Sequence, residues 1–408
     1  MILTFFISIL IFNFLLEFTL EYINGRRWSN KLPAELSGIY DTDKYKLSQE
    51  YDRVKKRFSL FTSAVNLGLM LLLILTGSFY LLDKWALYKG HSEVNASLLF
   101  FGVLFIVADL ISLPFSMYRI FVIEDRFGFN RTTLNIFFTD KIKSYVLGGI
   151  LGGSLLSIFV LFYQHAGPYF WIYAWVTFGL IMFFTTMFYA SWIVPLFNKL
   201  TPLPESSLRT AIENYCDSVD FKLDNLFVMD GSKRSSKANA FFSGIGRKKR
   251  IVLYDTLINN HTTEELVSIL AHEIGHYKKK HTRSGFILSI LQAGLMLYIF
   301  SRFIESPSLS EAFGSPAPSL RLGILGFALL YSPISLLMSL VMNAVSRKNE
   351  FEADRFAAIT SNGTALQESL KKLSVNNLSN LQPHPLYVFF YYSHPPLLQR
   401  LRALKPVS

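Results

Sequence analysis

Residues 263–277 read TEELVSILAHEIGHY, and this stretch decides how the second half of the chain is interpreted. Thr262 precedes two acidic residues, Glu264 and Glu265, which is typical of the first turn of a helix. Apolar side chains then return at helical spacing, at Leu266, Ile269 and Leu270. The pattern predicts a helix over about 263–281.

This predicted helix carries two histidines four residues apart. His272 and His276 therefore share one face, and Glu273 stands beside the first of them. Zinc proteases use two imidazole ligands at this spacing, with the adjacent glutamate as general base for the attacking water. The alternative is a surface helix that carries unrelated polar residues. We interpret the motif as the centre of a zinc site for peptide hydrolysis, with one Zn²⁺ per chain.

The composition places this motif in a membrane protein. Of the 408 residues, 51% are hydrophobic and 15% are aromatic, which is too apolar for an ordinary soluble domain. The single cysteine, Cys216, cannot form an internal disulfide and excludes a thiolate metal site. A net charge of +11 could indicate nucleic acid, but basic loops against anionic lipid explain it better in a membrane protein. No nucleic-acid partner is expected.

Seven stretches are long and apolar enough to cross a bilayer. They run over roughly 2–22, 60–82, 97–118, 145–165, 169–195, 284–304 and 321–345. The first lacks a basic start and a small-residue cleavage site, so we expect it to be retained as a span. The loops after the first and third stretches are rich in Lys and Arg, whereas those after the second and fourth are poor. The positive-inside rule then puts the N-terminus outside and the C-terminus inside.

This topology predicts a division of the chain into four parts. They are roughly 1–195, a membrane region with five helices; 196–283, a cytoplasmic segment with a small sheet and the histidine helix; 284–345, the last two spans; and 346–408, a C-terminal cytoplasmic segment that completes the zinc site. The strands are expected at about 226–229, 240–242 and 251–254. The predicted fold is mainly α, a polytopic membrane protein with an α+β cytoplasmic domain.

The seventh stretch leads into NAVSRKNEFEAD and supplies candidates for a third zinc ligand. If the helix continues, Glu350 and Asp354 lie one turn apart on one face, and Glu352 points away. A hairpin of two spans returns Glu350 to the level of the histidine pair. We predict Glu350 as the third ligand and Asp354 as the acceptor of a ring N–H from a ligand histidine. The alternatives are an Arg347–Glu350 pair on a solvated helix face, and Glu352 as the ligand.

Several segments resemble the membrane zinc proteases that process CAAX-motif proteins, the Ste24 type of the M48 group. They are spread over nearly the whole chain: IEDRFGFN at 123–130, SKANAFFSG at 236–244, RIVLYDTL at 250–257, LAHEIGHY at 270–277, the pair Glu350 and Asp354, and YSHPPLLQRL at 392–401. One departure is Lys237, which stands where close relatives often carry histidine.

The resemblance implies seven helices around a large water-filled chamber, capped by a gluzincin-like cytoplasmic domain, with the zinc facing inward. It implies that Asn239 and His394 bind the substrate backbone or stabilise the oxyanion, with Arg400 nearby. It also implies cleavage near the C-terminus of prenylated CAAX proteins. From the residues alone, Asn239 could equally belong to a turn, and His394 could be an ordinary loop histidine. The small sheet could offer an edge strand to an extended peptide.

Two other functions stay open. One is an HtpX-like membrane quality-control protease of the same group, although those relatives are shorter and lack the long N-terminal half. The other is a zinc-carrying transporter or scaffold, against which Glu273 argues, because a structural zinc site closes with four ligands and needs no base. The expected partners of the monomer are the bilayer and a peptide or protein substrate, prenylated or membrane-bound. The chain ends without an ER retrieval signal, which is compatible with a bacterial inner membrane.

Two features inside the predicted spans have a structural and a functional reading. Asp109 lies in the third span, where an ionisable group indicates function by default; a satisfied interhelical hydrogen bond is the alternative. Two small-xxx-small pairs in the fourth span predict close helix packing, and they are formed by Gly148, Gly149, Gly152 and Gly153.

Overall fold

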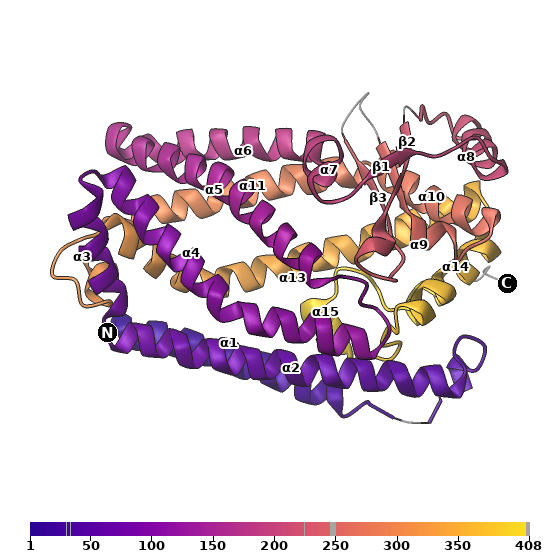
Figure 1. Ribbon diagram of the computed structural model, residues 1–408, viewed down its shortest axis with the longest axis horizontal. Coiled ribbons are helices and arrows are strands. Elements are labelled where there is room, and N and C mark those ends of the chain that lie inside the picture. Colours follow the sequence, from indigo (N-terminus) through magenta and orange to yellow (C-terminus); the bar gives the residue numbers. More distant parts are fainter. Residues whose placement is uncertain (30, 33, 224, 245–249, 405–408) are drawn as a thin grey trace.

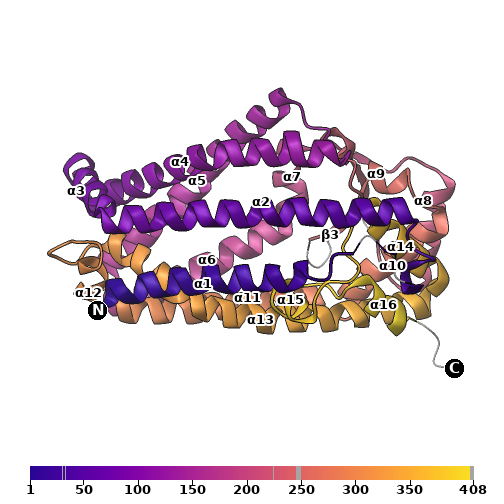
Figure 2. The same cartoon turned by 90° about the horizontal axis from the view of Figure 1, so that it is seen from below.

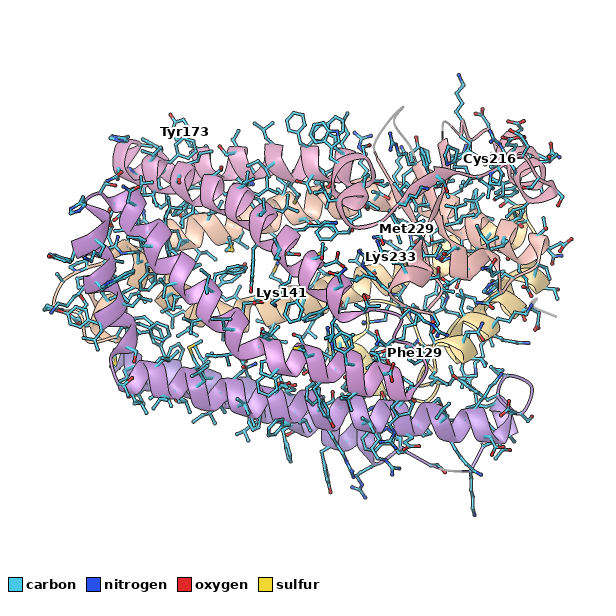
Figure 3. All side chains as sticks on the ribbon, in the orientation of Figure 1. Phe129, Lys141, Tyr173, Cys216, Met229 and Lys233 are labelled. Atoms are coloured by element: carbon cyan, nitrogen blue, oxygen red, sulfur yellow. The ribbon has the colours of Figure 1, made fainter. Side chains whose placement is uncertain are left out.

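The computed structural model describes residues 1–408 apart from 30, 33, 224, 245–249 and 405–408. The protein is elongated: long helices run along its length, and a small sheet with several short helices gathers at one end (Figure 1). The chain starts at the end remote from the sheet. Tyr173 and Cys216 mark the two ends in Figure 3, the first among the long helices and the second beside the sheet.

Seven helices within the described residues are long and apolar enough to cross a membrane, as predicted. Two of them run on into π-helical turns, α4 into Arg119–Glu124 and α6 into Tyr189–Ile193. The seven are α1 (Ile2–Gly25), α2 (Thr42–Leu75), α4 (Glu93–Tyr118), α5 (Leu134–His165), α6 (Phe170–Phe188), α11 (His281–Phe303) and α13 (Leu320–Thr360).

Two predicted helix ends are wrong, and left-handed residues explain both. Helix α2 ends two residues before Gly77, whose φ is 67°. The predicted span 60–82 therefore continues into a separate helix, α3 (Ser78–Gly90). Lys280, with φ of 63°, separates α10 (Thr263–Lys278) from α11, so the predicted helix 263–281 is three residues shorter. A positive φ interrupts the i to i−4 hydrogen-bond ladder that a right-handed helix needs.

The seven long helices contact one another in a closed ring. Helix α1 packs on α2, α4 on α5, α5 on α6 and α6 on α11, while α13 packs on both α11 and α1; Figure 2 shows α1 beside α13. The rings of Phe58 and Phe115, 6.4 Å apart, join α2 to α4. Between 6% and 22% of the residues in each apolar window are buried. Most side chains of the spans thus face outward or line spaces between helices, and one such space is a cavity of about 560 Å³ between α5, α6, α11 and α13.

A buried ion cluster holds the end of the ring that is remote from the sheet. Arg321, in the first turn of α13, is 1% exposed. Its guanidinium hydrogen-bonds to Asp83 of α3, and its Nη1 lies 2.9 Å from Glu93 at the start of α4. A charge buried this deeply is tolerated only when its partners are buried with it. The cluster therefore joins three helices at one point.

The described residues at the other end form a four-stranded sheet in the order β1-β2-β4-β3. The strands are β1 (Leu200–Pro202), β2 (Asn225–Met229), β3 (Ala240–Ser243) and β4 (Arg250–Tyr254). Strands β2 and β4 are parallel, and the other two pairs are antiparallel. The three predicted strands are confirmed. Strand β1 went unpredicted because it is short and ends in proline, which is typical of an edge. Strand β3 is the opposite edge.

Short helices complete this compact part, by which we mean the sheet with α7–α10 and α14–α16. Thr262 and Glu265 form a reciprocal capping box at the start of α10, which satisfies two backbone N–H groups. Ile251 and Leu253 of β4 pack with Leu270 and Ile274 of α10, each at most 1% exposed. The remaining helices are α7 (Val194–Phe197), α8 (Ser207–Ser218), α9 (Asp255–Ile258), α14 (Gly363–Asn376), α15 (Pro385–Tyr391) and α16 (Leu397–Ala403), with α12 (Pro307–Glu311) at the remote end and 3₁₀ turns at Ala34–Leu36, Gly167–Tyr169 and Gly231–Lys233.

Helices α10 and α13 approach each other closely. A Cβ placed on Gly275 of α10 would lie 3.1 Å from the backbone of Ala353 in α13, so any larger residue would require the helices to shift by a few tenths of an ångström. Helix α13 is continuous from Leu320 to Thr360. The predicted boundary between 345 and 346 thus falls inside one helix, which runs from the remote end to the compact part.

The polar and small residues inside the spans have structural explanations. Asp109 of α4 accepts a hydrogen bond from Lys141 Nζ at 2.8 Å and another from the Tyr145 hydroxyl, both on α5; Lys141 is labelled near the middle of the molecule in Figure 3. The alternative of a satisfied interhelical hydrogen bond is therefore the observed arrangement.

The prediction of close packing at the glycines is wrong, because an added Cβ meets nothing within 4 Å at Gly148, Gly149 or Gly152.

Candidate active site

Helices α10 and α13 bring together the three residues that the sequence proposes as metal ligands. The Nε2 atoms of His272 and His276 lie 3.2 Å apart. The carboxylate of Glu350 lies 3.5 Å from the first of these nitrogens and 3.3 Å from the second. All three ligand atoms are within 4.8 Å of one another, so two imidazole nitrogens and one carboxylate oxygen converge on a single point.

The other ring nitrogen of His272 is held by a buried acid. Its Nδ1 lies 2.9 Å from Asp354, which is 1% exposed. Arg400 of α16 donates two hydrogen bonds, of 2.7 and 2.6 Å, to the same carboxylate. Burial lowers the pKa of His272, but the hydrogen bonds that its ring donates to the carboxylates of Asp354 and Glu350 outweigh burial and raise that pKa to about 9. The imidazole is thus fixed in orientation by a carboxylate that a guanidinium fixes in turn.

The second histidine has a partner that sequence reasoning missed. His276 Nδ1 lies 3.1 Å from Nδ1 of His281, and Nε2 of His281 lies 3.1 Å from Glu352. His281 comes back toward the motif because the left-handed Lys280 turns the chain between α10 and α11. A helix continued to 281 would have pointed this ring elsewhere. Glu352, the alternative third ligand, therefore contacts His281 and not the group of three ligand atoms.

Glu273 lines a cavity of about 550 Å³ together with the three ligand residues. We call it the metal cavity. Burial raises the pKa of the Glu273 carboxyl, and the neighbouring imidazoles of His272 and His276 offset this only in part. A carboxyl with a raised pKa gives up and takes back protons closer to neutral pH than an ordinary one. Glu273 thus lies beside the converging ligand atoms with a raised pKa, as the prediction of a general base requires.

Asn239 and His394 both line the metal cavity. Asn239 immediately precedes the edge strand β3, and its side-chain oxygen accepts the backbone N–H of Ala240 at 2.9 Å. His394 follows α15, is 65% exposed, and places its Nε2 3.3 Å from Glu350. One side chain is thus tied to the edge strand, while the other contacts Glu350 through Nε2 and lies 3.0 Å from the Ser393 hydroxyl through Nδ1.

Two basic residues named from the sequence serve other contacts. Arg347 does not pair with Glu350; it donates hydrogen bonds to the carbonyls of Val388 and Tyr392 and so holds α15 against α13. Lys237 donates to Glu124 at 2.8 Å and to the Tyr51 hydroxyl at 2.7 Å. It therefore links the segment before β3 to α2 and to the turn after α4, away from the ligand atoms.

The donor set fits zinc. Zn²⁺ in catalytic sites takes three nitrogen or oxygen ligands from the protein and leaves one position for water or substrate. Here three such donors converge, and both histidines have a protein partner on their other nitrogen, as metal-bound histidines usually do. The ligand residues are also largely buried, with His272 at 8% and Glu350 at 4% exposure.

Comparison with known protein families covers almost the entire chain. Residues 21–199 match the family described as CAAX prenyl protease N-terminal, five membrane helices. Residues 202–408 match peptidase family M48. The first match takes in α2, α4, α5 and α6 with the last residues of α1, and the second contains all the residues of the metal cavity.

Individual relatives extend over the same length. CAAX prenyl protease 1 of Saccharomyces cerevisiae is 36% identical over 96% of this chain and 93% of its own, and the homologue of Homo sapiens is 32% identical over 92% and 89%. The crystal structure of Ste24p from S. mikatae superposes with a TM-score of 0.94 at 34% identity, covering 99% of both chains. The chain therefore belongs to peptidase family M48, as a multi-pass membrane metalloprotease of the Ste24, or CAAX prenyl protease 1, type.

Proposed function

We propose that this protein cuts peptide bonds with one zinc ion held by His272, His276 and Glu350. The observation that carries the proposal is the convergence of these three ligand atoms within 4.8 Å, on the wall of a cavity that Glu273 also lines. When bound, zinc polarises the scissile carbonyl and lowers the pKa of water. Glu273 takes a proton from the attacking water and delivers it to the leaving amine.

The substrate peptide would bind along the edge strand. Strand β3 has β4 on one side only, so its outer backbone groups can pair with an extended peptide. Asn239 lies at the start of that edge and His394 across the cavity, and both would donate hydrogen bonds to the carbonyl oxygen as it gains negative charge. Asp354 and Arg400 would act through His272, by keeping its ring oriented.

The relatives' name suggests the substrate class. A CAAX motif is the C-terminal end of a protein whose cysteine carries a prenyl group. We propose that this chain acts as a monomer on prenylated, membrane-bound proteins of this kind. A cavity of about 590 Å³ beside β3, lined by Phe183 of α6 and by Phe286 and Ile287 of α11, supports the idea because it could receive a lipid-modified segment. The match of residues 21–199 to a CAAX protease family favours this substrate over general quality control.

The proposed topology puts the compact part on the cytoplasmic side and the N-terminus on the other. Basic residues at the junction of α10 and α11, such as Lys279 and Arg283, support this orientation. The proposed boundaries at about 195, 283 and 345 mark where the chain passes between the membrane part and the compact part. The sequence also predicts that the protein is located in a bacterial inner membrane. The eukaryotic relatives named above do not test this prediction.

The proposal is tested with purified protein and a farnesylated CAAX peptide. We expect cleavage that phenanthroline stops and added zinc restores. Glu273→Gln should keep stoichiometric zinc but lose at least about a hundredfold in rate, whereas Glu264→Gln, exposed in the first turn of the same helix, should change neither. Glu350→Ala should lose the metal, as measured by mass spectrometry. Full activity of Glu273→Gln, or full zinc content of Glu350→Ala, would refute these assignments.

A further inference from the structure

A second cavity adjoins the metal cavity. It measures about 390 Å³, and we call it the distal cavity. Helix α2 contributes Tyr51, Asp52 and Lys55 to its wall. The wall that separates it from the metal cavity is made of described residues that line both: Leu370, Leu373, Asn377, Ser379, His394 and Arg400. The two cavities therefore lie side by side, and His394 and Arg400 border both of them.

The wall of the distal cavity includes a lysine, Lys55, that forms no ion pair with an acidic side chain among the described residues. Lys55 is exposed, and its ammonium lies 4.6 Å from the centre of the Tyr51 ring. Among the described residues, no hydrogen bond or ion pair of this ammonium is formed. The other cation in the cavity wall is Arg400, and two nitrogens of its guanidinium donate hydrogen bonds to Asp354.

The acids near Lys55 are already paired. Glu124 accepts hydrogen bonds from Lys237 on one oxygen and from Tyr51 on the other. Asp52 accepts from the indole of Trp28 at 2.8 Å and from Asn380 at 3.1 Å, and it lies 3.6 Å from the ammonium of Lys56. The positive charge of Lys55 is thus available to an anion that enters the cavity.

The shared wall carries an unused hydrogen-bonding atom. Oδ1 of Asn377 is buried and has no partner among the described residues. A buried polar atom without a hydrogen bond is unfavourable, and Asn377 belongs to the wall that both cavities share. A peptide that passes from the metal cavity to Lys55 would supply the missing partner with a backbone N–H.

We propose that the distal cavity is the subsite for the free C-terminus of the substrate, and that Lys55 binds its terminal carboxylate. The inference rests on the proposed function. Cleavage after the prenylated cysteine leaves three residues, which extend about 10 Å as a strand. That length carries the carboxylate out of the metal cavity and into the adjoining one.

The opposite end of β3 supports this direction of binding. There a cavity of about 590 Å³ is lined by Phe183 of α6, Phe242 of β3, and Phe286 and Ile287 of α11. Its wall also holds Lys278, Lys280 and Arg283, but its aromatic and aliphatic side chains lie against two membrane helices and suit the prenyl group. The distal cavity, on the other side of the metal cavity from this apolar surface, is then assigned to the C-terminal end. The peptide would run with its lipid toward the membrane helices and its terminus toward Lys55.

The test measures binding without turnover. The zinc-loaded Glu273→Gln protein is titrated with a fluorescent peptide that ends in farnesyl-cysteine and three aliphatic residues, made as the free acid and as the C-terminal amide. We expect the free acid to bind about tenfold more tightly, as a charge-assisted hydrogen bond allows. Adding Lys55→Gln should remove this preference and leave the affinity for the amide unchanged, while Lys55→Arg should retain most of it. Lys46→Gln, an exposed lysine nine residues earlier on α2, is the matched control.

Equal affinity for acid and amide in the protein with Lys55 intact would overturn the inference, and so would an unchanged preference after Lys55→Gln. The unchanged affinity for the amide shows that the variant is folded. The same peptides are then offered to the protein with Glu273 intact. Failure to cleave either peptide would contradict the proposed function, whereas the binding preference decides the role of Lys55 independently of cleavage.

Discussion

At the scale of single residues, the two histidines of the site are each held in position by neighbouring side chains. His272 is supported by Asp354 and Arg400, and His276 by His281. Glu273 is different, because no neighbour within the motif neutralises its buried carboxyl completely. Its proton affinity is therefore set mainly by burial.

The raised pKa of Glu273 predicts how activity depends on pH. The base works only as the carboxylate, so activity falls as the pH drops through its pKa. Since burial raises that pKa above the ordinary value of 4.5, we expect the acid limb of kcat/KM to have its midpoint above pH 4.5. The profile is recorded with zinc content measured at each pH, so that loss of metal is separated from protonation. A midpoint at or below 4.5 with full zinc would contradict the prediction.

At the scale of elements, the crossing of α10 and α13 makes the metal site. Two ligands come from the first helix and one from the second, so their convergence depends on how closely the two helices pack. Gly275 lies between the histidines in the sequence, on the side of α10 that touches Ala353. The glycine of the motif is thus explained by packing and not by chemistry.

Replacing Gly275 by alanine should push these helices apart. The new Cβ would lie 3.1 Å from the Ala353 backbone, which cannot move aside as a flexible side chain could. We expect a loss of about 1–3 kcal/mol in stability, seen as a lower midpoint of thermal unfolding, together with weaker zinc binding. Gly285→Ala in α11 is the matched control, because its Cβ would meet nothing within 4 Å; alanine there should be neutral or stabilise by about 0.5–1 kcal/mol. Equal behaviour of the two variants would contradict the explanation.

At the scale of the whole molecule, the closed ring of spans is held at both ends. The compact part joins the helices at one end, and the cluster of Arg321, Asp83 and Glu93 joins α13, α3 and α4 at the other. The two ends of the ring are thus fixed by different contacts, a packed domain at one end and an ion cluster at the other. A metal site at one end then depends on the remote end only through the stability of the ring.

Arg321→Leu should therefore destabilise the protein without harming the chemistry. It leaves Asp83 buried and unpaired, which should cost about 3–5 kcal/mol. We expect a clearly lower unfolding midpoint in detergent, with zinc content and kcat of the folded fraction unchanged. Lys84→Leu, at an exposed position next to Asp83, serves as the control and should leave the midpoint nearly unaltered. An Arg321→Leu protein with the parental midpoint would show that the cluster does not hold the ring.

The sequence by itself determined the class of the protein and most of its site. Apolar runs of span length and the pair His272 and His276 depend only on local periodicity, which is readable along the chain. Glu350 and Asp354 could be placed as well, because a hairpin of two spans returns the chain to the level from which it started. The tertiary structure alone decided the contact between His276 and His281, the packing at Gly275, and the cavity that joins Asn377 to Lys55. These depend on a left-handed residue, on the distance between two helices, and on elements more than 300 residues apart, none of which leaves a periodic signal in the sequence.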